Sequence, residues 1–320
     1  MESNDYSSVT AYADFIRDAE AEYLVPGLNQ GLIPQGMDVW EEQNLLLISG
    51  YFKDNGTFPS SLIVAVDLTT GKLVGTYSLK KVDGSYYTGH AGGVAVTEKN
   101  LFIANSSRLY RIPLSQIESA GESGTLRFVE EIKVPVTASF CNYANGVLWA
   151  GDFYLAGTYD TPEWRHLTNK SGTTYYAWAV GFTLEDTERE IAATAWDALT
   201  MDYATPDYVL SITEKVQGIA FVGDKIVLSQ SYGRAANSKL YVYENVLSST
   251  QDTSVTVNGK EIPVWFLDSA SKTYTALPMA EGITDYNGKL LVLFESGATY
   301  YREDGGKYPT DHVWSVTLTD

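Results

Sequence analysis

Five versions of one strand–turn–strand unit recur along this chain, and they constrain its fold more than any other feature. The clearest version is QGIAFVGDKIVLSQSY from Gln217 to Tyr232, in which Gly223-Asp224 makes a tight turn between two apolar strands. The others are QGMDVW…LLLISGYF from Gln35, GGVAVTEKNLFIANSS from Gly92, ASFCNYANGVLWAGDFY from Ala138 and EGITDYNGKLLVLFESG from Glu281. Units that cannot bury both faces alone imply a closed or stacked array.

A third strand with period-two alternation follows each unit: SLIVAVDL, SRLYRIPL, TYYAWAVGFTL, SKLYVYEN and DHVWSVTL. The fifth unit ends before a fourth strand, whereas residues 22–28 precede the first unit and are otherwise unassigned. If 22–28 supply the missing outer strand, the ring closes and no long sheet edge stays exposed. The sequence therefore predicts an all-β, five-bladed β-propeller of four-stranded antiparallel blades, closed by an N-terminal strand.

The boundaries of the domains and of the blades follow from these strand patterns. We expect an N-terminal helical extension over residues 1–20, with Ser8 as candidate N-cap, and a single propeller domain over 21–320. The predicted blades are 35–80, 90–135, 138–213, 217–268 and 281–318 plus 22–28. Their fourth strands are expected at 73–80, 126–135, 207–213 and 263–268. Good helix formers within the 185–206 insertion predict a helix in blade 3.

The hairpin SLIVAVDLTTGKLVGTYSL at residues 61–79 resembles the strand–turn–strand signature of YVTN-type and quinoprotein-type propellers, which include bacterial secreted proteins. This resemblance covers one hairpin, so it implies the fold and transfers no site residues. Gluconolactonase-like and lactonase-like propellers are similar at the level of the fold only.

Charge and composition exclude some classes of partner. The chain has 40 acidic and 22 basic side chains, a net charge of −18 and a pI near 4.5, which disfavours nucleic acid as a partner. The sequence contains no run of 18 or more apolar residues, so it predicts no transmembrane segment. Cys141 is the only cysteine, so no intramolecular disulfide can form, and we expect it to be an inert buried residue. An acidic composition rich in Tyr, Gly and Thr favours an extracellular or cell-envelope monomer whose signal peptide has been removed.

Polar side chains occur where the inner strands of a propeller begin and where the second strands end, and both positions lie at the same end of the axis. Burying such groups without partners is costly, so their recurrence indicates a shared site. Aromatic residues in the adjoining loops add flat surfaces that suit a small molecule, a glycan or a peptide. The alternative is a hydrogen-bonded plug that joins neighbouring blades, with the rings only packing the loops. The candidate ligand-binding residues are Gln35, Tyr51, His90, Asn105, Asp152, Tyr154, Gln217, Gln230, Tyr232, Glu281 and Glu295.

Four of these residues are also candidates for catalysis: Glu281, Glu295, His90 and Asp152. Two carboxyl groups forced together raise one another's pKa, which is one origin of acid–base pairs. The alternatives are a salt bridge from Glu295 to Arg302 and a loop-positioning role for His90.

The sequence contains no HxxxH, CxxC or EF-hand spacing, which leaves zinc and loop-type calcium sites unsupported. A ring of amide and carboxylate oxygens could still hold Ca²⁺ on the axis. No GxGxxG, P-loop or GxSxG pattern occurs in the required context.

Three functions compete. We expect a binding module that recognises a small molecule, glycan or peptide at the end of the axis. The first alternative is a hydrolase or lyase, since gluconolactonase-like and streptogramin-lyase-like propellers use a metal or a His/Glu pair. Arabinanase-like and levansucrase-like glycosidases need three carboxylates on inner strands, whereas Gln35 and Gln217 stand at two of those places. The second alternative is a scaffold that binds another protein, although the polar residues concentrate at the axis rather than on a broad surface.

Overall fold

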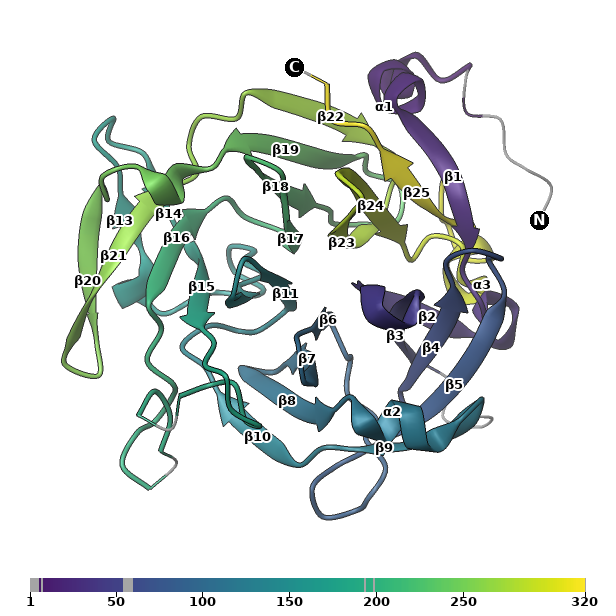
Figure 1. Ribbon diagram of the computed structural model, residues 1–320. Helices are drawn as coiled ribbons and strands as arrows, with labels where there is room; N and C mark the ends of the chain where they lie inside the picture. The colour runs from purple at the N-terminus through teal and green to yellow at the C-terminus, as the bar shows by residue number, and fades with distance from the viewer. Residues whose placement is uncertain (1–5, 7, 54–59, 193, 198, 320) are drawn as a thin grey trace.

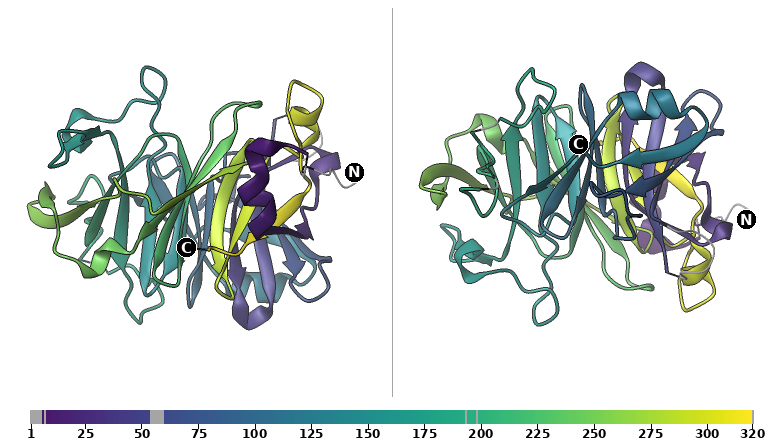
Figure 2. Two further views of the ribbon diagram at one scale, coloured as in Figure 1. Left: turned by 90° about the horizontal axis from the view of Figure 1, so that it is seen from above. Right: turned by 90° about the horizontal axis from the view of Figure 1, so that it is seen from below.

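Five sheets, each with a core of four antiparallel strands, stand around a central axis and form the predicted five-bladed β-propeller (Figure 1). The computed structural model describes residues 6, 8–53, 60–192, 194–197 and 199–319. The side views in Figure 2 show loops that project from both ends of the ring. No helix among the described residues is both long enough and apolar enough to cross a membrane.

Blades 1 and 2 differ from the expectation in their outer strands. Blade 1 contains β2 (Leu32–Trp40), β3 (Leu45–Phe52), β4 (Leu62–Asp67), β5 (Leu73–Lys80) and β9 (Ser123–Arg127). Blade 2 contains β6 (Gly93–Val96), β7 (Asn100–Asn105), β8 (Arg108–Pro113) and β10 (Glu130–Lys133). The single fourth strand predicted at 126–135 is wrong: β9 pairs in parallel with β5 of the preceding blade, and only β10 completes blade 2. Helix α2 (Ser115–Ala120) reverses the chain between β8 and β9.

A strand predicted for blade 4 likewise belongs to the preceding blade, blade 3. Blade 3 contains β11 (Phe140–Ala144), β12 (Val147–Gly151), β15 (Ala177–Thr183), β16 (Tyr208–Ile212), β21 (Lys260–Phe266) and β20 (Thr253–Val257). Blade 4 contains β17 (Val216–Val222), β18 (Lys225–Gln230), β19 (Ser238–Glu244) and β22 (Lys272–Ala276). The strand expected at 263–268 as part of blade 4 instead runs parallel to β16, so that assignment is wrong. A small hairpin of β13 (Leu167–Thr168) and β14 (Thr174–Tyr175) lies in the long loop of blade 3.

Blade 5 closes the ring as predicted. It consists of β23 (Ala280–Tyr286), β24 (Lys289–Phe294), β25 (His312–Val316) and the N-terminal β1 (Ala19–Leu24). The closing strand begins three residues before the expected position, and it pairs antiparallel with β25 from Ala19↔Val316 to Leu24↔His312. Because this strand joins the two ends of the chain, the ring has no open gap between its first and last blades.

The N-terminal helix is shorter than predicted. Helix α1 spans Ala13–Asp18 and follows a 3₁₀ turn at Thr10–Tyr12, and no side chain caps either element, so the predicted cap at Ser8 is wrong. Tyr12 and Phe15 are nevertheless fully buried against blades 4 and 5, and these contacts hold the helix on the outside of the ring.

The hydrophobic core is divided into five clusters, one between each pair of neighbouring blades. Each cluster combines alternate residues of two facing sheets, which is why every blade shows period-two patterning. Representative buried pairs are Leu47 and Val94, Phe102 and Cys141, Trp149 and Ile219, Val227 and Val292, and Leu46 and Leu291.

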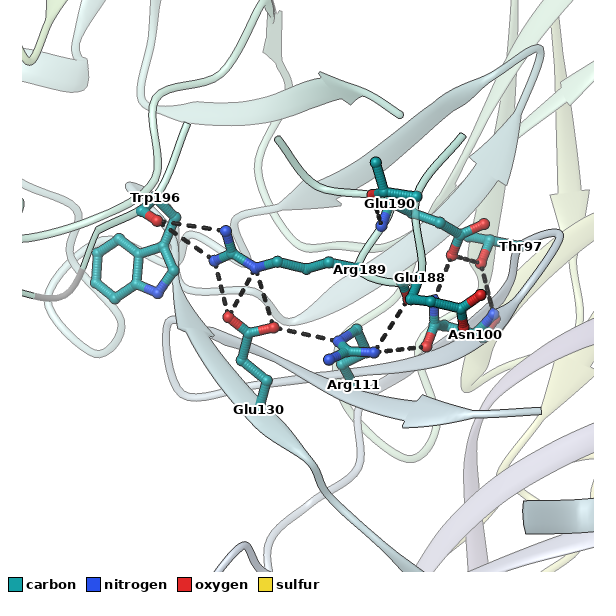
Figure 3. Close-up of polar contacts among 9 residues, drawn as sticks. Thr97, Asn100, Arg111, Glu130, Glu188, Arg189, Glu190 and Trp196 are labelled. Carbon is teal, nitrogen blue, oxygen red and sulfur yellow. Dashed lines mark hydrogen bonds and ion pairs between the residues drawn. The ribbon is translucent and has the colours of Figure 1, made fainter. Parts of the chain in front are cut away.

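The insertion at 185–206 forms turns, and no helix occurs among its described residues, so the predicted helix is wrong; residues 193 and 198 lie outside the description. Its side chains bind blade 2 instead (Figure 3). The buried Glu190 carboxylate accepts hydrogen bonds from Thr97 Oγ1 and from Asn100 Nδ2 at 2.7 Å. Arg189 Nε donates to Glu130 at 2.9 Å. Polar contacts between blades therefore override the local helix propensity of this segment.

Candidate functional site

Three inner strands carry a β-bulge at the position of a predicted site residue. The pairing register shifts between Pro34 and Met37, between Val216 and Gly218, and between Ala280 and Ile283. The bulged residues include Gln35, Gln217 and Glu281, each followed by glycine. A bulge redirects a side chain out of the regular alternation, and here it presents three polar side chains toward the axis.

The glycines after the bulges allow the inner strands to converge. A Cβ atom at Gly36 would lie 2.7 Å from the Cα of Gly93 and from the amide nitrogen of Val94 in the next blade. A Cβ atom at Gly282 would lie 2.9 Å from the amide nitrogen of Met37. Because side chains cannot fit at these contacts, the backbones approach closely and bring the polar residues of different blades within hydrogen-bonding reach.

These residues line a cavity of about 590 Å³ at one end of the axis, which we call the axial cavity. Its volume falls within the range of small-molecule sites, about 300–1,000 Å³. Eight predicted residues line it: Gln35, Tyr51, His90, Asn105, Gln217, Tyr232, Glu281 and Glu295. It also includes Lys53, Phe153, Tyr159, Arg234 and Tyr301.

Glu281 and Glu295 form a hydrogen-bonded carboxyl pair on the floor of the axial cavity. Glu281 lies on β23 and Glu295 immediately follows β24, so both come from blade 5. Gln217 Nε2 donates to Glu281 Oε1 at 3.0 Å, and Gln35 Nε2 donates to Glu295 Oε2 at 2.8 Å. The two glutamines come from the blades on either side, and the pair therefore links three blades across the axis.

The environment of this pair favours retention of one proton. Burial, followed by repulsion from Glu295, raises the pKa of Glu281 well above its usual range. Burial also raises the pKa of Glu295, but hydrogen bonds from Gln35, Glu281 and Tyr301 partly offset that effect. At neutral pH the proton therefore resides mainly on Glu281, which donates to the Glu295 carboxylate.

Three aromatic side chains, Phe153, Tyr159 and Tyr232, form part of the lining of the axial cavity. Phe153 packs edge-on against Tyr159 with ring centroids 5.5 Å apart, and its ring lies 6.1 Å from that of Tyr232. Tyr159 and Tyr232 are 54% and 49% exposed, so their faces are open to a ligand. Exposed rings that share a cavity with convergent polar groups allow simultaneous stacking and hydrogen bonding.

His90 lies at the rim of the axial cavity beside Tyr51, with ring centroids 4.1 Å apart. Desolvation lowers the pKa of His90, and the charge of Lys53 adds to that effect. The imidazole is therefore neutral at neutral pH, and it can donate or accept a hydrogen bond without adding charge.

Three predicted residues lie outside the lining. The Asp152 carboxylate is fully buried, accepts hydrogen bonds from two backbone amides and pairs with Arg165 at 2.5 Å. Tyr154 stacks on Tyr176 with ring centroids 5.0 Å apart. Gln230 Nε2 donates to the Glu214 carbonyl at 2.9 Å. All three have structural partners within blades 3 and 4. Arg302, which the sequence offered as an alternative partner for Glu295, binds Asn29 and Thr299.

The sequence patterns did not identify Lys53 and Arg234 as lining residues. Both lie in loops, beyond β3 and β18 respectively, where no periodicity gives the direction of a side chain. Their cationic groups lie near the rings of Tyr300 and Tyr301, which belong to the short helix α3 (Thr299–Arg302) far along the chain.

The other end of the axis holds a second cavity, of about 360 Å³, whose lining includes Asp38, Asn142 and Thr284. The Asp38 carboxylate is buried and accepts hydrogen bonds from the Val96 amide at 2.7 Å and from Thr284 Oγ1 at 2.6 Å. Burial raises the pKa of Asp38 to about 6. Since Val96 and Thr284 belong to the two adjacent blades, Asp38 joins blades, the structural role that the sequence offered as an alternative for axial polar residues.

Within the described parts of the chain, no group of three or more His, Cys, Asp or Glu side chains is arranged to hold a metal ion. Among the described residues that line the axial cavity, only Glu281 and Glu295 are acidic. The axial Ca²⁺ that the sequence allows stays a prediction, and a melting temperature unaffected by a chelator would contradict it.

No protein-family model matches this sequence, and no curated protein matches it. Solved structures with a similar course of the chain include glutaminyl cyclase from Myxococcus xanthus, at 9% identity and a TM-score of 0.46, covering 94% of this chain and 97% of that one. A second is a GH43_1 enzyme from Xanthomonas citri, at 10% identity and a TM-score of 0.46, covering 91% of this chain and 90% of that one. A third is BamB from Moraxella catarrhalis, at 9% identity and a TM-score of 0.32, covering 88% of this chain and 82% of that one. At these values the similarities carry no argument about what this chain binds or does.

Proposed function

We propose that this protein is a binding module that holds a small polar ligand with a ring, such as a sugar, in the axial cavity. The observation that carries the proposal is the amphipathic lining of this cavity. Hydrogen-bonding groups of Glu281, Glu295 and Gln35 and the exposed rings of Tyr159 and Tyr232 line the same space of about 590 Å³. A sugar has polar edges and less polar faces, which suit such a mixed lining.

Ligand-observed NMR with a panel of monosaccharides, disaccharides, short peptides, aromatic alcohols and aromatic acids tests this proposal. Tyr232→Ala should weaken binding about tenfold because it removes a stacking surface worth about 1.4 kcal/mol. Tyr86→Ala is the matched control, since Tyr86 is 46% exposed and lies on blade 1 outside the axial cavity. A panel without a binder, or equal losses in the two variants, would refute the proposal.

An acid–base enzyme is the second candidate, and the shared proton of the Glu281–Glu295 pair favours it. One carboxyl can donate a proton while the other accepts one, as hydrolysis of a lactone or an ester requires. The direct hydrogen bond between the two groups argues against glycosidase chemistry, in which the carboxyls stand about 5 Å or about 6.5–9.5 Å apart. Turnover of a lactone and ester panel that disappears in Glu281→Gln and in Glu295→Gln would establish the enzyme. Binding without turnover leaves the binding module.

A further inference from the structure

Two cations are gathered over one pair of tyrosine rings at the edge of the axial cavity. Lys53 Nζ lies 4.0 Å from the ring centroid of Tyr300 and 5.1 Å from that of Tyr301. Arg234 Cζ lies 5.1 Å and 5.3 Å from the same two centroids. Two positive charges near one another repel, and a negative charge nearby lowers the energy of such an arrangement.

The described residues supply only part of that compensation. Arg234 pairs with Asp304, whose side chain is mostly exposed. Lys53 forms no ion pair with any carboxylate of the described residues, and it contacts the two rings. Its charge nevertheless acts inside the axial cavity, because it opposes the rise in the pKa of Glu295 that burial causes and adds to the lowering of the pKa of His90 by desolvation.

The axial cavity therefore combines cationic donors with acceptors. Lys53 and Arg234 supply the positive charge, while Glu281, Glu295 and Gln217 supply acceptors. An ammonium and a guanidinium that converge on one cavity are suited to a carboxylate, and charge-assisted hydrogen bonds are roughly twice as strong as neutral ones.

We propose that the ligand of the axial cavity carries a carboxylate, which binds between Lys53 and Arg234 while its hydroxyl groups face the Glu281–Glu295 pair. A sugar acid or another hydroxylated ring acid has this chemistry. The inference rests on the proposed binding function, and it adds the charge of the ligand.

Matched acid and neutral compounds test the charge separately from binding itself. Isothermal titration calorimetry measures the affinity of the protein for glucuronate and for glucose, and for each aromatic acid in the panel and its amide. The ratio of the two affinities in each pair gives the preference for the acid. We expect the acid of a binding pair to bind about tenfold more tightly, equivalent to about 1.4 kcal/mol. The preference should shrink as salt is added, because screening weakens an ion pair at an open cavity.

Lys53→Met should remove this preference, so that the acid binds the variant no more tightly than the neutral compound does. Lys53 and Lys81 are both exposed, so neither change should disturb the fold, and Lys81→Met on blade 1 is the control with the same change in net charge. Neutral compounds that bind as tightly as their acids, or a Lys53→Met variant that keeps the preference, would overturn the inference while the binding function stands. A panel in which nothing binds refutes both.

Discussion

Replacing Glu281 by glutamine should remove part of the decrease in folding stability that the protein shows as the pH rises. In the folded protein the pKa values of Glu281 and Glu295 are raised above the ordinary glutamate value of 4.5. Above that pH an unfolded chain releases both protons, whereas the folded chain retains at least one. The folded state then binds more protons, so the stability contributed by the pair is complete below about pH 4.5 and is lost as the pH rises.

The size of the effect follows from proton linkage. One retained proton costs at most about 1.4 kcal/mol of stability per pH unit, or on the order of 2–3 kcal/mol between about pH 5.5 and pH 7.5. In Glu281→Gln the amide can donate to Glu295 and accept from Gln217, as the protonated carboxyl does. The shape of the side chain at position 281 and its hydrogen bonds to Glu295 and Gln217 are thus preserved, and the folded variant does not have to retain a proton at this position.

Urea unfolding across this pH range measures the free energy of unfolding of both proteins. We expect the stability of Glu281→Gln minus that of the unmodified protein to increase by on the order of 2–3 kcal/mol from about pH 5.5 to pH 7.5. Contributions from Asp38, Asp285 and His90 are common to both proteins and cancel in this difference. Glu118→Gln, on the exposed face of α2, controls for the change in net charge. Parallel pH profiles for the unmodified protein and Glu281→Gln would refute the shared proton.

Three further substitutions test how the structure holds the site and its surroundings. Gly36→Ala should lower the free energy of unfolding by at least about 1–3 kcal/mol in urea, because its Cβ would overlap the backbone of the next blade; an unchanged midpoint would contradict the close approach. Arg165→Met should cost about 3–5 kcal/mol in the same assay, since it leaves the buried Asp152 without its cation, and a loss below about 1 kcal/mol would mean that the pair is not needed. Glu190→Gln should speed proteolysis within residues 185–206, because the charge-assisted hydrogen bonds to blade 2 weaken, while the rest of the chain stays resistant; unchanged cleavage would exclude this anchoring role.

The recurring unit made much of the fold predictable. Period-two alternation marks strands, and the fivefold recurrence, together with the missing last strand, requires closure by the N-terminal segment. The same recurrence places Gln35, Gln217 and Glu281 at equivalent positions, so their convergence on the axial cavity follows from the sequence once the ring is assumed. Whether they bind a ligand stays a prediction that the experiments above address.

Only the tertiary structure decided which sheet receives each additional strand and which loop side chains enter the axial cavity. Strands β9 and β21 have ordinary strand patterns, but they pair in parallel with other blades because the connecting segments direct them there. Lys53 and Arg234 meet over Tyr300 and Tyr301 through contacts between loops far apart in the chain. A local pattern encodes the direction of a side chain within a strand, whereas the meeting of distant loops depends on the packing of the whole ring.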